Sequence, residues 1–143
     1  MNFNETLPFL FAQISTYLKV EIEKQLNEFG LHSGQIFVIF ELWKTDGQSQ
    51  IELSAHLKLS PPTINRMVKS LMKNGFVVNA QCPTDGRAIR IFLTPKAVAI
   101  RPQIEERWRK IEEKLIANLT PTERLVLSDL FQKLVDNLLT AEG

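Results

Sequence analysis

The chain has 143 residues, 44% of them hydrophobic, and this size and composition predict one globular domain with its own buried core. A single cysteine, Cys82, excludes an intramolecular disulfide and a cysteine-based metal cluster, as is typical of a reducing compartment. We expect a cytoplasmic protein with neither an export signal nor a membrane anchor, because no basic segment precedes the first apolar stretch and no apolar run approaches the ~18 residues of a membrane span.

The net charge of +1 conceals an uneven distribution along the chain. Residues 1–57 contain three Lys or Arg and seven Asp or Glu, whereas residues 58–96 contain seven basic residues and one acidic residue. Residues 97–143 are close to neutral, with seven basic and eight acidic residues. A basic middle third in an otherwise acidic or neutral chain favours a surface that binds a polyanion.

Apolar residues at helical spacing predict two helices in the first third of the chain. The first is a long amphipathic helix over residues 5–29, which Gly30 ends. Ser33 is the residue that we expect to cap the second helix, which carries the apolar residues Ile36, Phe37, Ile39, Phe40 and Trp43. It ends at the turn dipeptide Asp46-Gly47.

Capping signals predict two shorter helices in the region that follows. Ser49, with Glu52 three residues later, has the pattern of a capping box for a helix over residues 50–57. Ser60 precedes a proline, which suits the first position of a helix because its missing N–H would have had no partner there. Gly75 ends this fourth helix.

The third and fourth helices have the spacing of a helix-turn-helix. Only Lys58, Leu59 and Ser60 separate them, and we expect the small Ala55 to lie where the two helices approach closely. The apolar residues that the two helices would share as a core are Leu57, Leu59, Ile64, Val68 and Leu71.

The remaining face of the fourth helix is polar and basic. Amide and hydroxyl groups can meet base edges in a major groove, and cationic groups can meet guanine or phosphate. A solvated surface helix would carry similar charges, but the tight turn, the caps and the hairpin that follows favour DNA binding. The candidate residues in and beside this helix are Ser60, Pro62, Thr63, Asn65, Arg66, Lys69, Ser70 and Lys73.

After Gly75 the apolar period changes from 3.6 to 2, in two runs over residues 76–81 and 88–93. This pattern predicts a β-hairpin. Its turn would be formed by Pro83, Asp85 and Gly86. The charged tip either keeps the hairpin soluble or reaches for a negatively charged partner, and the sequence up to this point leaves both readings open.

Two further helices are predicted after the hairpin. Thr94 and the proline after it start a fifth helix over about residues 95–118, which Pro102 should kink or break because it removes an internal hydrogen bond. Thr120, with Glu123 three residues on, starts a sixth helix that extends to about residue 141.

The stretch "DGRAIRIFLT", residues 85–94, follows the helix-turn-helix directly, and long helices lie at both ends of the chain. In this arrangement the chain resembles the MarR family of winged-helix transcriptional regulators over nearly its whole length. The resemblance implies a mainly α fold with a small hairpin wing in a single domain, residues 1–143. The winged helix-turn-helix would span about residues 33–94 and the connecting helix about 95–118. The dimerisation helices would span about 5–29 and 120–141.

The resemblance also implies partners and residue roles. A homodimer would bind double-stranded DNA at a near-palindromic site, and it would act as a repressor relieved by a small aromatic ligand. Arg87 would enter or approach the minor groove, Asp85 would orient it, and Arg90 would contact the DNA backbone. The position of the hairpin supports this role for Arg87, because a hairpin directly after the recognition helix lies beside the groove that the helix enters.

Other candidate sites receive less support from the sequence. His32, His56 and the remote Cys82 form no recognisable metal-binding set, and Cys82 is more typical of an inert thiol than of a redox switch. No nucleophile elbow, phosphate loop or paired-carboxylate motif is present. We therefore expect neither an enzyme nor a cofactor. The alternative function is a dimeric winged-helix module for protein interaction that has lost DNA binding.

Overall fold

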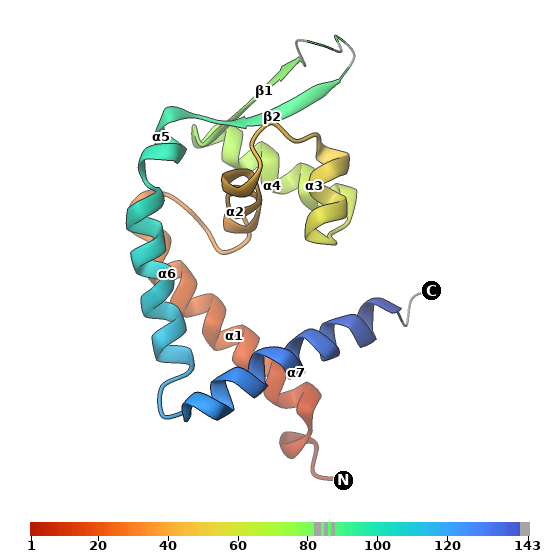
Figure 1. The fold of residues 1–143 in the computed structure, drawn as a ribbon, viewed down its shortest axis with the longest axis vertical. Helices are drawn as coiled ribbons and strands as arrows, with labels where there is room; N and C mark the ends of the chain where they lie inside the picture. The colour runs from red at the N-terminus through yellow and green to blue at the C-terminus, as the bar shows by residue number, and fades with distance from the viewer. Residues whose placement is uncertain (82–83, 85, 87, 141–143) are drawn as a thin grey trace. The chain divides into compact units, whose positions relative to one another are not determined.

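A computed structural model describes residues 1–81, 84, 86 and 88–140 (Figure 1). These residues form a mainly helical fold with one two-stranded antiparallel sheet, which confirms the predicted fold class. The elements in chain order are η1 (Phe3–Glu5), α1 (Leu7–Leu26), η2 (Asn27–Phe29), α2 (Ile36–Lys44), α3 (Gln50–Leu57), α4 (Pro61–Lys73), β1 (Val77–Gln81), β2 (Ile89–Leu93), α5 (Pro95–Ala99), α6 (Arg101–Leu115) and α7 (Pro121–Thr140).

The chain divides into two compact units, residues 1–111 and residues 112–143. Buried apolar side chains of the first unit form one core, to which helices α1 to α6 and both strands contribute. Its members are Ile22, Leu26, Leu31, Ile36, Val38, Ile39, Leu42, Leu53, Ile64, Val68, Leu71, Phe76, Val77, Ile91, Ala97, Ile104 and Ile111. No helix in the described part of the chain is long and apolar enough to cross a membrane.

The predicted caps of three helices are confirmed. The Ser49 side chain accepts a hydrogen bond from the backbone N–H of Glu52 at the start of α3 (3.1 Å). Ser60 and Thr94 accept in the same way from the N–H three residues on, at the starts of α4 and α5 (3.4 Å each). Each hydroxyl thus satisfies one backbone donor that has no partner inside its helix.

Left-handed residues lie on both sides of α4. Lys58, with φ of 56° and ψ of 41°, closes the tight turn from α3 to α4. At the other end Gly75 has φ of 78°, a conformation that costs glycine little. The N–H of Gly75 donates to the Met72 carbonyl and that of Phe76 to the Leu71 carbonyl, so the chain turns sharply from α4 into β1.

Two local predictions about the helices are wrong. Ser33 does not cap α2, which begins at Ile36 with Gln35 as an N-cap that makes no side-chain cap bond. The N–H and the hydroxyl of Ser33 instead donate to Glu23 of α1 (2.9 and 2.8 Å). Ala55 is exposed, so it is not the point of close approach between α3 and α4.

The predicted hairpin is confirmed in its strands. Val77 pairs with Leu93, and the next four pairs follow in antiparallel register. Val77 is buried while the rest of β1 is exposed, so the hairpin is anchored at its base and projects away from the core (Figure 1). Cys82, Pro83 and Asp85, which include two of the predicted turn residues, lie outside the described residues.

Two predictions for the C-terminal half are also confirmed. The predicted helix over residues 95–118 is broken at Ile100 into α5 and α6, and Pro102 is the second residue of α6. In the second unit, Thr120 and Glu123 form a reciprocal capping box at the start of α7. The Thr120 N–H donates to the Glu123 carboxylate (2.9 Å), and the Glu123 N–H donates to the Thr120 hydroxyl (3.1 Å).

Candidate nucleic-acid interface

The inward face of α4 fixes which of its side chains point outward. Ile64, Val68 and Leu71 are buried, at the spacing of one helical stripe. The predicted candidates occupy the remaining positions: Ser60, Pro62, Arg66, Lys69 and Lys73 are exposed, and Thr63, Asn65 and Ser70 are partly buried. The α4 helix lies next to α3 and to the hairpin (Figure 1). The structure therefore brings these candidates together along one helix.

The exposed face of α4 is positively charged. Arg66, Lys69 and Lys73 lie on a helix that contains no acidic residue. Among the residues that the structure describes, none of these three cations lies within 4.0 Å of a carboxylate. Unpaired cations that follow one face of a helix create a positive potential that attracts phosphate.

Ser70 faces a different environment from that predicted. The Nε2 of Gln35, a buried residue at the start of α2, donates to the Ser70 hydroxyl. This bond turns Ser70 toward α2, because the position lies at the edge of the buried stripe. Ser70 therefore joins α4 to α2, and its role in DNA binding stays a prediction.

The base of the hairpin is attached to the connector between α2 and α3, residues 45–49. The N–H of Ile91 donates to the Gln48 carbonyl (2.7 Å), and the N–H of Leu93 donates to the Asp46 carboxylate (2.9 Å). Gly47 lies so close to Phe92 that a Cβ on the glycine would be 2.7 Å from the ring. Gln48 of the connector thus forms an isolated antiparallel bridge with Ile91 at the outer edge of β2.

Arg90 of β2 also contacts this part of the molecule. Its Nη1 donates to the Gly47 carbonyl (3.0 Å) and to the Glu52 carboxylate (3.1 Å). The resemblance implied a contact between Arg90 and the DNA backbone, and no local pattern in the sequence indicated these protein partners. Asp85 and Arg87, the other two candidates in the hairpin, lie outside the described residues.

Gln48 is a residue of this region that the sequence analysis missed. Its side chain is 1% exposed, and its Nε2 donates to the Thr45 carbonyl (2.6 Å) and the Glu41 carbonyl (3.3 Å). Its Oε1 accepts from His56 Nδ1 (2.7 Å). The residue joins α2, α3 and β2, yet a glutamine in a polar connector carries no sequence signal for such a role.

A carboxylate of α1 holds the loop that leads into α2. Glu23 accepts from Ser33 and from His32 Nδ1, which lies 3.1 Å away. Partial burial would raise the pKa of Glu23, but the hydrogen bonds from the Ser33 N–H, His32 and the Ser33 hydroxyl together lower it below its ordinary value. The carboxylate is thus the form that stabilises the loop.

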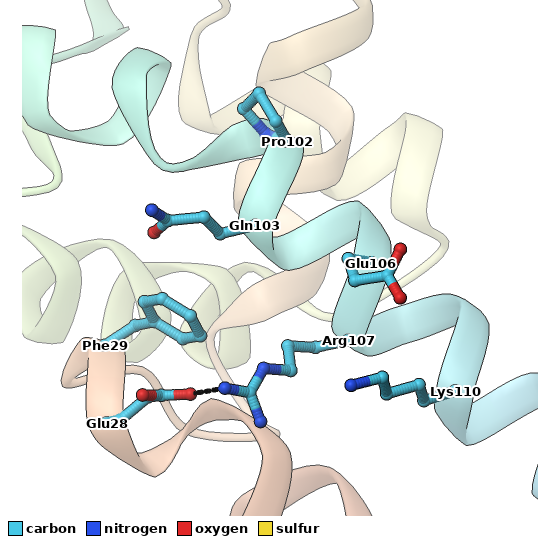
Figure 2. A pocket seen from close by; sticks show the side chains of 7 residues that line it. All are labelled: Glu28, Phe29, Pro102, Gln103, Glu106, Arg107 and Lys110. Carbon is cyan, nitrogen blue, oxygen red and sulfur yellow. Dashed lines mark ion pairs between the residues drawn. The ribbon is translucent and has the colours of Figure 1, made fainter.

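A separate hollow lies where the end of α1 and η2 face α6 (Figure 2). It has a volume of about 500 Å³ and is wide open to solvent. Arg107 pairs with Glu28 across it, and its guanidinium lies 5.9 Å from the centre of the Phe29 ring. The other lining residues are Pro102, Gln103, Glu106 and Lys110. Within the described residues, no group of three His, Cys, Asp or Glu side chains could hold a metal ion.

Comparison with known proteins relates this arrangement to a family. Residues 31–89, which include α2, α3, α4 and β1, match the model of the MarR family. The HTH-type transcriptional regulator YwoH of Bacillus subtilis is 30% identical over 129 residues, which cover 90% of this chain and 93% of that protein. The chain belongs to the MarR family. The candidate residues of α4 lie inside the part that matches the family model, and Arg90 lies just beyond it.

Solved structures of MarR proteins share the fold. A MarR transcriptional regulator from Methanosarcina mazei is 25% identical and superimposes with a TM-score of 0.80, over 92% of this chain and 88% of that one. A mutant MarR from E. coli, solved in complex with operator DNA, has a TM-score of 0.81 over 94% of this chain and 98% of that one. At 23% sequence identity, this comparison shows that the two proteins share a fold.

Proposed function

We propose that this MarR-family chain is a transcriptional repressor that binds double-stranded DNA with α4 in the major groove and the hairpin beside it. The observation that carries the proposal is the exposed face of α4, where Arg66, Lys69 and Lys73 have no carboxylate partner among the described residues. The buried stripe of the same helix holds this face rigidly outward. Ser60, Pro62, Thr63 and Asn65 add polar and small groups at the N-terminal half, where base edges are reached.

The proposed functional unit is a homodimer. Both terminal helices carry large apolar side chains that remain exposed in one chain, and burial against a second copy would remove this surface from water. The residues in α1 are Leu7, Phe9, Leu10, Phe11, Ile14, Tyr17 and Val20, and those in α7 are Leu125, Val126, Leu130, Phe131, Val135, Leu138 and Leu139. Twofold symmetry requires a near-palindromic site with half-sites about 34 Å apart.

The proposal includes roles for two residues of the hairpin and for a small ligand. Arg87 reaches toward the minor groove, and Asp85 orients it. A small aromatic ligand relieves repression, and the hollow beside Phe29 and Arg107 offers an aromatic ring and a cation to such a ligand (Figure 2).

A gel shift with random genomic fragments at low and moderate salt tests DNA binding, and sequencing of the bound fragments gives the preferred site. The dimer should select a near-palindrome. Repetition with small aromatic acids tests ligand relief. A chain that shifts no fragment at either salt concentration would instead be the protein-interaction module.

Variants of α4 then test how the helix is oriented. Asn65→Ala and Arg66→Ala should relax the sequence preference and cost ~1–3 kcal/mol each, the value of a good base contact. Lys73→Ala should keep the preference and lower the slope of log affinity against log salt by up to ~0.9 per lost phosphate contact. A changed preference in Lys73→Ala, with the other two variants unaffected, would reverse the assigned orientation.

A further inference from the structure

The hairpin contains an ion pair that the proposed function does not use, formed by Arg90 of β2 and Glu52 of α3. We propose that Arg90 is a positioning residue, which holds the hairpin at a fixed place beside α3 and α4 and does not itself contact DNA. This inference rests on the proposed DNA-binding function, and it replaces the backbone contact that the resemblance implied for Arg90.

Two contacts of Arg90 are directed into the protein. One guanidinium nitrogen donates both to the Glu52 carboxylate (3.1 Å) and to the Gly47 carbonyl (3.0 Å). The side chain of Arg90 is 32% exposed and that of Glu52 is 41% exposed, so the pair is partly screened from water. Bonds between a cation and a carboxylate are stronger than neutral hydrogen bonds when partly buried.

The two acceptors belong to parts of the fold that position α4. Glu52 lies in the first turn of α3, and its N–H is held by the Ser49 cap. Gly47 lies in the connector, next to the residue whose carbonyl accepts from the Ile91 N–H. The α3 helix in turn packs against α4 across a three-residue turn. Arg90 therefore connects the hairpin to the helix-turn-helix through its side chain, in addition to the backbone hydrogen bond between Ile91 and Gln48.

The charges at this location support a structural role for Arg90. Without Arg90, the partly exposed Glu52 would be an unpaired carboxylate on α3, the helix that packs against the proposed DNA-binding helix α4, and this negative charge would repel phosphate. The ion pair neutralises it. If Arg90 moved to contact DNA, it would leave both Glu52 and the Gly47 carbonyl without this donor. The exposed cations of α4 can bind phosphate without breaking an ion pair of this kind.

A protein that reads two grooves at once binds more tightly when its two reading elements are already held at the correct separation. Loss of Arg90 would loosen the hairpin without removing a phosphate contact. Affinity for DNA should then fall while its dependence on salt remains the same.

Glu52→Gln gives the sharpest test, because the two roles of Arg90 predict opposite signs. If Glu52 positions the hairpin through Arg90, the variant should bind DNA roughly 3- to 10-fold more weakly, the range of one partly exposed charged hydrogen bond. Arg90→Met should weaken binding to a similar degree with an unchanged salt slope. Tighter binding by Glu52→Gln, or a slope lowered by ~0.9 in Arg90→Met, would show that Arg90 contacts DNA.

A charge reversal and two controls accompany these variants. Glu52→Arg combined with Arg90→Glu keeps the net charge and can rebuild the pair, so it should bind DNA more tightly than either single reversal. If Arg90 contacts phosphate, the double variant should bind as weakly as Arg90→Glu alone. Glu113→Gln and Lys24→Met, on α6 and α1, control for the change in net charge and should bind as the unmodified protein does.

Hydrogen exchange in the absence of DNA separates failure of this inference from failure of the proposed function. The amides of Ile91 and Leu93 donate to the connector, so Arg90→Met and Glu52→Gln should raise their exchange rates by roughly 3- to 10-fold. Arg66→Ala should leave these rates unchanged. If the unmodified protein binds no DNA, the proposed function fails and the exchange rates alone decide the positioning role. Unchanged exchange in both variants would overturn that role.

Discussion

The winged-helix region, from α2 to β2, and the terminal helices α1 and α7 differ in where their apolar residues lie. The α2 and α4 helices bury Ile36, Val38, Ile39, Leu42, Ile64, Val68 and Leu71, whereas α7 buries no residue and α1 buries only Ile22 and Leu26. One region completes a core within the chain, and the other leaves its apolar side chains at the surface. The proposed DNA-binding face of α4 therefore rests on a core within its own chain, and the exposed apolar side chains of the terminal helices suit the proposed dimer.

The largest expected effect is that of a charge on the apolar face of α7. Leu130 is 47% exposed in one chain, and Leu130→Asp would place a carboxylate in the proposed dimer interface twice by symmetry. An unpaired buried charge costs about 3–5 kcal/mol, so the dimer dissociation constant should rise at least about a hundredfold. Sedimentation equilibrium over a range of concentrations measures this constant.

Gln132→Asp is the matched control, because it adds the same charge to the same helix at an exposed polar residue. The Gln132 side chain donates a hydrogen bond to Asp136, one turn further along α7. Its dissociation constant should stay within a few-fold of the unmodified value. If the unmodified chain remains a folded monomer at micromolar concentration, the terminal helices do not form a dimer interface.

A smaller effect is expected at the junction of the two regions, where Glu23 of α1 holds His32 and Ser33. Glu23→Gln should lower the free energy of unfolding by about 1 kcal/mol at neutral pH, a modest value because the Glu23 side chain is 37% exposed. Since folding lowers the pKa of Glu23, this stabilisation is complete above the ordinary pKa of a glutamate in the unfolded chain and is lost as the pH falls through the lower pKa of the folded state.

Urea unfolding at pH 7 and at pH 3 measures the difference between Glu23→Gln and the unmodified protein. The difference should be largest at pH 7 and should shrink at pH 3. A difference that grows on acidification would contradict the lowered pKa. In that case Glu23 would not join α1 to the winged-helix region in its charged form.

The smallest effect is expected within the winged-helix region itself. Lys58 adopts a left-handed conformation, which costs a residue with a Cβ more than it costs glycine. Lys58→Gly should therefore stabilise the chain by about 0.5 kcal/mol, after the greater entropy of glycine in the unfolded state is included. Lys58→Ala removes the same charge and keeps the Cβ, so thermal unfolding of this variant should show no such gain.

Local signals account for most of what the sequence predicted correctly. A cap such as Ser49 or Ser60 acts on an N–H three residues away, and Pro102 acts on its own helical turn, so the cause and the effect lie within one short segment. The buried stripe of α4 follows from helical periodicity in the same way. The inward and outward faces of the recognition helix were therefore predictable from the chain alone.

The sequence did not reveal hydrogen bonds to distant partners, and for this reason the predicted Ser33 cap was wrong. Ser33 has the residue type of a cap, but its partner Glu23 lies ten positions earlier on another helix. Ser70 bonds Gln35, and Arg90 bonds Glu52, which lies 38 positions before it. The hydrogen-bonding capacity of these side chains could be read from the sequence, but their partners are set by tertiary packing.

The connector beside β2 has a consequence for the DNA. Because residues 46–48 are bonded to β2 and continue directly into α3, the spacing between the reading helix and the base of the hairpin is built into a short, hydrogen-bonded segment. If α4 and the hairpin bind DNA as proposed, a duplex that does not match this spacing has to bend or change its groove width, and the energy of this deformation depends on the base steps involved. Base pairs that no side chain touches would then contribute to the choice of operator.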